Sequence, residues 1–532
     1  MKRSVVWRMA SVAVLITAVM ATVVQAQQPT VVVSIRGIAA LLDDAEFIGA
    51  EIGQTGVKES AETLIGVFTQ QKGLAGIDQT KPLGVYVNVT AGGPPAPVVF
   101  LPVSDADALQ DLVKVFIDDL EVTKGQWKGT AAGTKLFGKV SSGYLFLSTD
   151  AAALTKPADP TKIVSGKYDI SLDVSLAAIP EPFKAQFLEQ VESEGRKGLE
   201  NGPEPKNEAE RVGRDLGFDG TLAVMKAIVN EGDRLTLGID LDEKTRLGGI
   251  DVSITGKSNS GMAKAMTAYG KIQPAFAGIG SEAAPVRVVI SYPTTGFTEQ
   301  LDAVFKALRS SADQEIAKDE RLTEDKDKAT AKKMASRLFD IAQATIKAGS
   351  LHSGFVLEDG GEGKIRMLGA TRVAQGDDVS KLMDDAIKAS KGSPELDKLK
   401  LDVAKQGGAR IHAVTPELDD DTEKYLGDEP IHFAIRTDSL WFSAGGGNLV
   451  SLKKALDQKP ATRTVGSPVS IQIKPAALVL LMEKDNEDLI ERAKEIAGKP
   501  SDKASLDLAP IANGVKLRIE FGIDLLKLAK ND

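Results

Sequence analysis

The stretch Asp233–Ala268, DRLTLGIDLDEKTRLGGIDVSITGKSNSGMAKAMTA, decides the fold class. Apolar residues alternate with polar or small ones in Arg234–Leu241 and again in Ile250–Thr255. Such alternation is typical of a strand with one buried face. The polar segment Asp242–Thr245 predicts a turn, and Ser258–Ser260 offers helix N-caps before an apolar stripe. The stretch therefore predicts a strand, a turn, a second strand and a helix.

Variants of this unit recur along the chain, each with the predicted order strand, helix or helices, hairpin, helix. The predicted copies lie near residues 31–118, 168–270, 286–388 and 468–531, and the last is shortened. The middle two are about 118 residues apart at matched elements, and a fixed spacing indicates an internal repeat. The larger grouping predicts two similar halves, residues 27–280 and 285–532, with a seam at Gly270–Pro285.

The repeated hairpins predict antiparallel sheets, because strands joined by short turns must run in opposite directions. The predicted helices carry apolar stripes that match the apolar strand positions, so we expect helices on one face of each sheet, in an α+β fold with duplicated sheets. The other face is predicted to be polar and to meet water or a polar partner. This pattern argues against a closed barrel with an apolar lumen. The polar positions include Ser171, Asp173, Ser175, Asp251, Ser253, Thr255, Ser470, Gln472, Lys474, Lys516, Arg518 and Glu520.

The first 26 residues predict a cleavable secretory signal. Lys2, Arg3 and Arg8 form a basic start, Met9–Val24 is apolar, and Val24-Gln25-Ala26 suits a signal peptidase that cuts after Ala26. The alternative is an uncleaved membrane anchor. We therefore expect a secreted or periplasmic protein, without deciding between the two, and no later segment that could span a bilayer.

Composition limits the classes of partner. At 532 residues, with 42% apolar and 26% charged residues, the chain is predicted to form two or more ordinary globular domains. Removing the predicted signal takes the formal net charge from −9 to −12, which disfavours nucleic acids and anionic membranes as partners. The chain has no cysteine, so apolar cores must stabilise it without disulfides.

Three sets of segments carry a family resemblance. They are YDISLDVSLAAIPEPFKAQFLEQVESEGRKGLE, which starts at Tyr168, GIDQTKPLGVYVNV with PVVFLPVSDADAL, and KVSSGYLFLSTDAAAL. These segments are similar to matching stretches of a family of uncharacterised secreted proteins from planctomycete-type bacteria. The resemblance covers most of residues 76–270 and more loosely the second half. It implies secretion and the duplicated layout, and it brings no activity or catalytic residue.

The three histidines, His352, His412 and His432, each fall on a predicted strand without metal-binding spacing. His412 and His432 lie on segments that could be neighbouring strands, so a metal site from that pair is one reading, and structural histidines are the other. Cysteine catalysis is excluded, and no GxSxG motif appears.

The sequences of two loops suggest ligand binding, but each also has a simpler structural explanation. Ala444–Asn448 (AGGGN) lies between a predicted strand and helix, where backbone NH groups can hold a phosphate, although a permissive turn is the favoured explanation of the glycines. Residues 417–429 concentrate carboxylates that suit calcium, although a solvated acidic loop has the same composition.

Ala312–Ala348 predicts one charged helix. Glu324 and Lys328 illustrate its mixed charges, and Met334, Leu338, Ile341 and Thr345 are expected to mark its buried side. It is either a solvated helix or a coiled-coil contact with a partner. Aromatic residues are 5% of the chain and Trp127 and Trp441 stand alone, which disfavours a lectin.

The sequence therefore predicts no catalytic, cofactor-binding or metal-binding residues, and no cofactor. The first hypothesis is an exported, non-enzymatic interaction or scaffold protein with a partner in the cell envelope. The second is a binding protein for a small or lipidic ligand held between the two halves. The third is a hydrolase that uses carboxylates such as Asp240 and Asp251, which fall on the polar side of one hairpin. The oligomeric state is left open.

Overall fold

A computed structural model describes residues 29–90, 95–295, 298–320, 322–389, 397–458 and 467–529, and the side chains of 298–300 are not described. The predicted signal, residues 1–26, lies outside these ranges. The chain forms two compact units. Unit 1 groups Met1–Ser193, Met225–Ala263 and Ala512–Asp532, and unit 2 groups Glu194–Val224 and Lys264–Ile511. The predicted halves, 27–280 and 285–532, follow chain order instead, and their boundary stays a prediction.

The fold-deciding stretch has the predicted structure. Strand β9 (Gly232–Asp242) and strand β10 (Leu247–Gly256) form an antiparallel hairpin, and helix α8 (Gly261–Tyr269) follows. The Ser260 hydroxyl accepts a hydrogen bond of 3.0 Å from the Ala263 backbone N–H, so Ser260 caps the helix as predicted. Alternation and caps were therefore sufficient to predict these elements.

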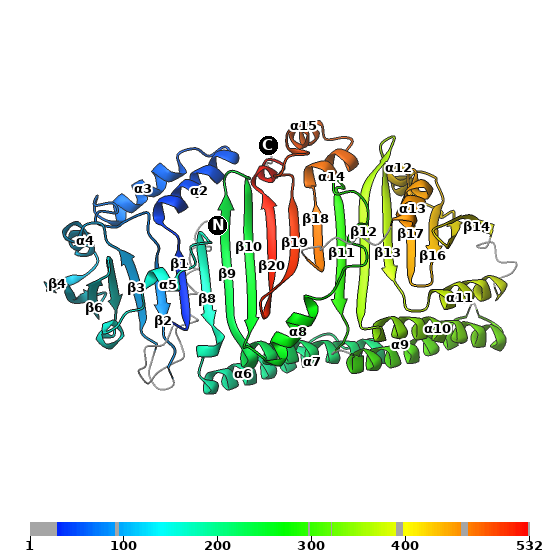
Figure 1. Cartoon of the computed structure of the whole chain (residues 1–532), viewed down its shortest axis with the longest axis horizontal. Helices are drawn as coiled ribbons and strands as arrows, with labels where there is room; N and C mark the ends of the chain where they lie inside the picture. The colour runs from blue at the N-terminus through cyan, green and yellow to red at the C-terminus, as the bar shows by residue number, and fades with distance from the viewer. Residues whose placement is uncertain are drawn as a thin grey trace. The chain divides into compact units, whose positions relative to one another are not determined.

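Unit 1 contains an antiparallel sheet whose strands lie in the order β4-β5-β6-β7-β3-β2-β1-β8-β9-β10-β20 (Figure 1). Its remaining strands are β1 (Val31–Ile35), β2 (Leu83–Val87), β3 (Pro97–Pro102), β4 (Asp118–Thr123), β5 (Gln126–Ala131), β6 (Thr134–Ser141), β7 (Tyr144–Ser148), β8 (Ile170–Ser175) and β20 (Gly514–Gly522).

Helical segments of unit 1 connect these strands. They are α2 (Ile38–Glu51), α3 (Val57–Phe68), α4 (Ala106–Val113), η1 (Ala151–Leu154), α5 (Pro160–Ile163), η2 (Leu176–Ala178) and η4 (Ile523–Lys527). Helices α6 (Glu181–Glu200) and α7 (Glu208–Glu231) have residues in both units, as does α8. Among the described residues, no helix is both long enough and apolar enough to span a bilayer.

Strand β7 is buried on both faces. Tyr144 and Phe146 pack with Phe100 and with Leu154 of η1, whereas Leu145, which points to the opposite face, packs with α4 and Trp127. Helices therefore cover both faces of the sheet around β7, which differs from the predicted single covered face. The burial of both faces follows from the sequence YLFLS, in which every side chain but the last is apolar.

Unit 2 contains strands in the order β14-β15-β16-β17-β13-β12-β11-β18-β19, all antiparallel. Their bounds are β11 (Val286–Pro293), β12 (Ser350–Gly361), β13 (Lys364–Arg372), β14 (Leu399–Gln406), β15 (Ala409–Val414), β16 (Ile431–Ile435), β17 (Ser439–Gly445), β18 (Val469–Ile473) and β19 (Ala504–Ile511). The helices are α9 (Thr298–Lys318), α10 (Asp325–Lys347), α11 (Gly376–Ala389), α12 (Asp420–Leu426), α13 (Asn448–Asp457), α14 (Pro475–Met482) and α15 (Glu487–Ile496). Helix α13 packs Leu452, Ala455 and Leu456 onto Val356, Leu368 and Ile411 of the sheet.

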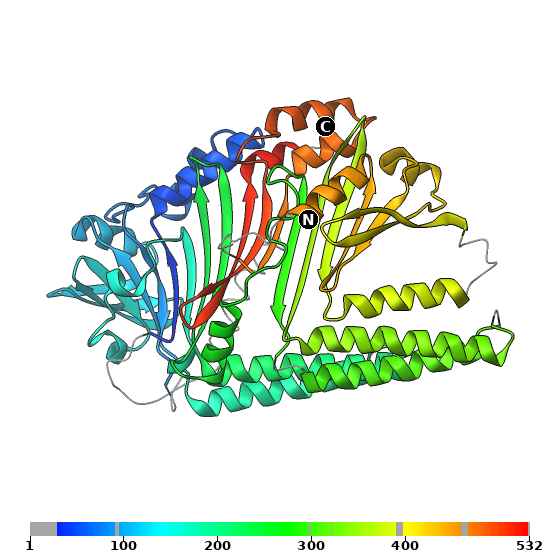
Figure 2. The same ribbon diagram turned by 45° about the vertical axis from the view of Figure 1, so that its right-hand side comes forward.

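The predicted charged helix Ala312–Ala348 is wrong, because two helices occupy this segment. Helix α9 ends at Lys318, and α10 begins at Asp325 and runs back beside it, as Figures 1 and 2 show. Phe305 contacts Phe339, and Arg309 reaches Asp340 at 2.5 Å, so the apolar positions of the pair face each other. Ile341 and Thr345 are buried as predicted, whereas Leu338 is exposed.

Candidate functional site

The register of unit 1 aligns aliphatic side chains across six neighbouring strands, β2, β1, β8, β9, β10 and β20. They form three cross-strand rows, which we call the aliphatic face of unit 1. The rows are Leu83–Ile35–Ile170–Ile239–Ile250–Ile519, Val85–Val33–Leu172–Leu237–Val252–Leu517, and Val87–Val31–Val174–Leu235–Ile254–Val515. Directly opposed residues stand about 5 Å apart at Cβ, so each row is a continuous strip of methyl groups.

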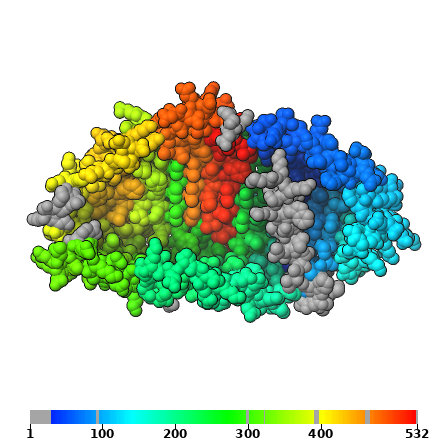
Figure 3. Space-filling model, turned by 180° about the vertical axis from the view of Figure 1, so that it is seen from behind, coloured from blue at the N-terminus to red at the C-terminus, as the bar shows by residue number. Residues whose placement is uncertain are grey.

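Solvent reaches this face. Val33 is 43% exposed and Ile239 is 40% exposed, and Ile519 and Phe521 are exposed as well. Helices α2 and α3 lie beyond the ends of the strands rather than over this face, as Figures 1 and 2 show. Seen from behind, strand β20 (red) has no helix of its unit in front of it (Figure 3). The prediction that helices cover the apolar face is therefore wrong for these strands.

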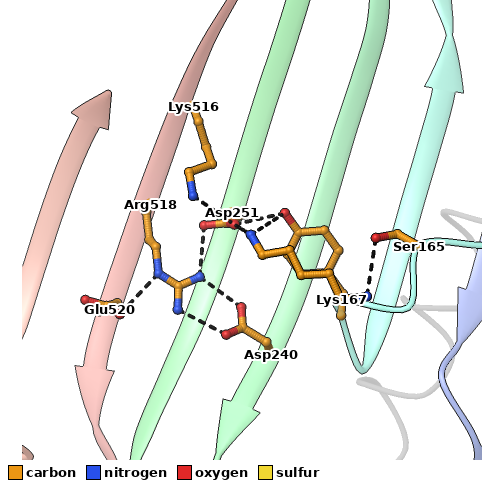
Figure 4. A network of polar contacts seen from close by, with 8 residues as sticks. Ser165, Lys167, Asp240, Asp251, Lys516, Arg518 and Glu520 are labelled. Atoms are coloured by element: carbon orange, nitrogen blue, oxygen red, sulfur yellow. Dashed lines mark hydrogen bonds and ion pairs between the residues drawn. The ribbon is translucent and has the colours of Figure 1, made fainter. Parts of the chain in front are cut away.

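The most deeply buried side chains of these strands lie on their polar face. Asp251 has no exposed surface, and Ser34 and Ser171 are buried and share a hydrogen bond of 2.9 Å. Asp251 lies in a cluster of charged groups from β9, β10, β20 and the segment before β8 (Figure 4). Its carboxylate receives Lys167 at 2.7 Å, the Tyr168 hydroxyl at 2.9 Å, Arg518 at 3.0 Å and Lys516 at 3.4 Å. The prediction that the polar face meets water is therefore wrong around Asp251, whose carboxylate is buried among its partners.

Glycines let the cluster lie close to the sheet. The Arg518 guanidinium covers Gly249, where an added Cβ would stand 2.5 Å from it, and it also binds Asp240 through both carboxylate oxygens at 3.0 Å. The Tyr168 ring covers Gly238 in the same way, with ring carbons 2.4 Å from an ideal Cβ. Mutual pairing and these overlying side chains explain how a polar sheet face is buried without a covering helix.

The electrostatics of the cluster are those of a structural ion-pair network. Burial alone would raise the pKa of Asp251, but hydrogen bonds from Lys167, Arg518 and Tyr168 outweigh it and hold the pKa of this carboxyl well below its usual range. The hydrogen bonding that Arg518 donates to Asp240 is the largest of the interactions that raise the pKa of Arg518. A carboxylate held ionised and occupied by cations is a poor general base.

We expect Gly238→Ala to destabilise unit 1 by about 1–3 kcal/mol, because its methyl group would push the Tyr168 ring off the sheet. Urea unfolding tests this in a Trp441→Phe background of the chain from Gln27, where Trp127 alone reports on unit 1. Gly166→Ala is the control, since an added Cβ meets nothing within 4 Å there. A midpoint for Gly238→Ala equal to that of Gly166→Ala would contradict the expectation.

Unit 2 has a comparable face. Its cross-strand rows are Met367–Leu357–Val286–Ile473–Ala504, Phe355–Val288–Ile471–Leu506 and Ile290–Val469–Leu508. Ile290, Tyr292 and Leu351 are exposed on this side, whereas Ser291 and His352 on the opposite side are buried. An exposed aliphatic face therefore recurs in unit 2, but its buried side is largely apolar, with Val289, Val356 and Leu368.

The three histidines lie on strands as predicted, in β12, β15 and β16. His412 is paired with Phe433 and His432 with Ala413, so their side chains point to opposite faces and cannot share a metal. His412 Nδ1 instead accepts the Asp402 backbone N–H at 3.2 Å, and burial lowers the pKa of His412. Among the described residues, no group of three or more metal-ligating side chains is present.

The glycine-rich turn before α13 is occupied by the chain itself. Gly447 caps α13 with a positive φ of 65°, and its backbone N–H donates to Glu429 at 3.1 Å. The Asn448 side-chain amide donates to the other Glu429 oxygen at 3.3 Å. The Glu429 carboxylate thus binds the backbone and side-chain amides that the phosphate hypothesis assigned to a ligand. The structure favours the interpretation of the glycines as a permissive turn.

The carboxylates of residues 417–429 are dispersed. Glu417 pairs with Lys398 at 2.6 Å, Asp419 caps α12 through the Thr422 backbone N–H, and Glu429 holds the turn at Gly447. Glu417, Asp419 and Glu429 therefore each have a structural partner.

A cavity of about 1030 Å³ lies in unit 2 between α13, α14 and the sheet. Leu368, Val450 and Leu481 line it, together with Glu358 and Arg366, which pair with each other at 3.1 Å. The charges at its polar side cancel, so it offers no selective charge to a ligand.

Sequence reasoning missed the exposed aliphatic faces and the partners of Asp251. The strand pattern alone does not distinguish an exposed aliphatic face from a buried one. Lys167 and Arg518 lie far from Asp251 in sequence and gave no local signal. No protein family, curated protein or solved structure matches this chain.

Proposed function

We propose that the chain is a non-enzymatic binding protein whose aliphatic faces hold the hydrocarbon chain of an amphiphile. The observation that carries this proposal is the continuous set of Val, Leu and Ile side chains on unit 1, in which Val33, Ile239 and Ile519 are exposed and most of the others are partly exposed. Monomeric proteins rarely expose a large contiguous apolar patch unless it binds something. The proposal develops the second hypothesis from the sequence, with the ligand on each face rather than between the halves.

The dimensions support a hydrocarbon chain as the occupant. The rows cross five steps between adjacent strands, which amounts to about 24 Å at the usual strand spacing. One leaflet of a bilayer contributes about 15 Å of hydrocarbon, so a membrane-lipid acyl chain fits along a row with room to spare. Each buried CH₂ contributes about 0.8 kcal/mol, so a whole chain would be held firmly.

The chemistry of the face favours a hydrocarbon over a folded protein. Protein interfaces are enriched in Tyr, Trp and Arg, which form their energetic hot spots. The three rows of unit 1 carry only branched aliphatic side chains and offer no hydrogen-bond donor or acceptor. A ligand without polar groups along its length matches such a surface.

The carboxylate hydrolase fits the site less well. Asp251 is buried and surrounded by cations, and Asp240 is held by both terminal nitrogens of Arg518. In the described part of unit 1, the carboxylate oxygens of Asp240 and Asp251 all contact cationic side chains of the chain itself. The interaction or scaffold role remains compatible with a binding protein, because a carrier also needs a surface to dock on.

The experiment is a titration of the chain from Gln27 with 11-(dansylamino)undecanoic acid, followed by displacement with palmitate. We expect saturable fluorescence enhancement, since the probe enters a dry apolar environment. Ile239→Glu places a charge in the middle of the unit 1 face and is expected to weaken probe binding at that face about tenfold or more. Ile290→Glu tests the face of unit 2 in the same way.

Ser253→Glu is the matched control, because Ser253 lies on the same hairpin but on the polar face, opposite Lys516. It is expected to leave probe affinity unchanged. Probe binding that is absent from the wild type, or equally reduced by Ile239→Glu and Ser253→Glu, would refute the proposal.

We also infer that the two units arose by duplication. The order β1-β2-β3-β7-β6-β5-β4 in unit 1 has the same connectivity as β11-β12-β13-β17-β16-β15-β14 in unit 2, which supports this inference. The N-terminal pattern of residues 1–26 and the resemblance to secreted proteins support export. A lipid carrier outside the cytoplasm is the function that these inferences describe together.

A further inference from the structure

Helix α3 presents an apolar ridge to solvent. Leu64 is 58% exposed, Val67 is 61% exposed and Phe68 is 72% exposed. Their spacing of three and four residues places them on one side of the helix, one turn apart. Ile65, between them in sequence, is half-buried, so the helix rests on its unit with Ile65 and points the other three outward.

The ridge is held rigidly, which excludes a frayed helix end as its cause. At the start of α3, the Glu46 carboxylate accepts the backbone N–H groups of Gly56 and Lys58, both at 2.9 Å. At its end, the Thr69 hydroxyl donates to the Ile65 carbonyl at 2.7 Å, and Lys72 donates to the Asp111 carbonyl at 2.6 Å. The helix that carries the exposed side chains is therefore anchored at both ends.

We propose that this ridge, Leu64, Val67 and Phe68, docks on the surface of a lipid bilayer. Aromatic and branched side chains on one side of a helix are the residues that insert at the boundary between headgroups and acyl chains. The acidic residues of α3, Glu59 and Glu62, lie in its first half, and its last turn has none, so the apolar end can enter a neutral bilayer without burying one of these charges.

The size of the ridge favours lipid over a protein partner. A stable protein interface needs about 800 Å² on each side, which three side chains cannot supply. Lipid requires no complementary surface, because each apolar side chain gains free energy by itself when it enters the hydrocarbon. The docking surface stands independently of the aliphatic faces, although a carrier of acyl chains would use it to reach its source.

The test is co-sedimentation of the chain from Gln27 with phosphatidylcholine vesicles, since residues 1–26 would themselves partition into lipid. The wild type is expected to sediment with the vesicles, and 0.5 M salt is expected to leave this unchanged because the contact is apolar. The double variant Val67→Ser/Phe68→Ser is expected to reduce partitioning about tenfold or more.

Val450→Ser is the control, because Val450 is 74% exposed as a single apolar residue on α13 of unit 2. It should bind vesicles as the wild type does. Absence of wild-type binding, or equal binding by the double variant, would overturn the proposal. Ile239→Glu should still bind vesicles and the double variant should still bind the dansyl probe, so failure here is distinguishable from failure of the proposed function.

Discussion

Replacing Asp251 by Ala is expected to destabilise unit 1 by about 3 kcal/mol. The change removes the shared partner of Lys167, Lys516 and Arg518 and leaves three cations close together on a buried sheet face. Lys167 and Lys516 keep some contact with water, which places the cost at the lower end of the range for breaking a buried pair. Urea unfolding followed by Trp127 fluorescence, in the Trp441→Phe background, measures it.

Asp240→Asn is the matched control. Arg518 keeps Asp251 and Glu520 as partners in that variant, and Asp240 is more exposed than Asp251, so a loss of about 1 kcal/mol or less is expected. An Asp251→Ala variant as stable as Asp240→Asn would show that the cluster does not stabilise the fold.

The pH dependence follows from the lowered pKa of Asp251. The folded pKa lies below the unfolded value, so the ion pairs stabilise the fold above about pH 4 and this stability is lost as the pH falls further. Asp251→Asn is expected to remove this part of the acid sensitivity.

Elements that depend on local pattern were predicted well from the sequence. β9, β10 and α8 follow from alternation and a serine cap within one stretch of 36 residues. The four recurrences of strand, helices, hairpin and helical segment also appear in the observed element order, from β1 to α4, from β8 to α8, from β11 to α11 and from β18 to η4. Periodicity is a property of consecutive residues, so one sequence suffices to read it.

Which face of a sheet is buried could not be predicted in the same way. The alternation in β9 distinguishes Leu237 from Thr236, but it does not say what covers either face. The usual rule assigns the apolar side to the core. Here Arg518 and Tyr168 fold over glycines on the polar side, and they approach from segments hundreds and tens of residues away. Burial of the polar side depends on contacts with distant segments. Within the hairpin itself, the only sequence feature that indicated it was the pair of glycines at 238 and 249.

The candidate site was missed for the same reason. An exposed aliphatic face and a buried one have identical strand patterns, so the sequence argued against an apolar surface where the structure has one. The charged segment 312–348 failed differently, because its mixed charges are compatible with one continuous helix. The reversal shows only in contacts between α9 and α10, such as those of Phe305 with Phe339 and of Arg309 with Asp340.

Replacing Asp44 by Asn is expected to stabilise unit 1 at pH 7 by about 2–3 kcal/mol. Asp44 is a buried residue of α2 whose Oδ2 has no hydrogen-bond partner. Burial, and then repulsion from Asp169, raise the pKa of Asp44 to about 6, although Arg36 acts in the opposite direction. At neutral pH the ionised Asp44 carboxylate therefore lowers the free energy of unfolding.

The sign of the pH effect follows from this raised pKa. Between about pH 4 and pH 6 the folded state holds a proton on Asp44 that the unfolded state has released, so stability should fall as the pH rises through this window. Unfolding of the wild type across that range should show the slope, and Asp44→Asn should flatten it. Asp43→Asn removes only a surface pair with Lys58 at 2.7 Å and should retain the slope. Equal slopes in wild type and Asp44→Asn would mean that Asp44 stays ionised throughout, with Arg36 close enough to outweigh Asp169.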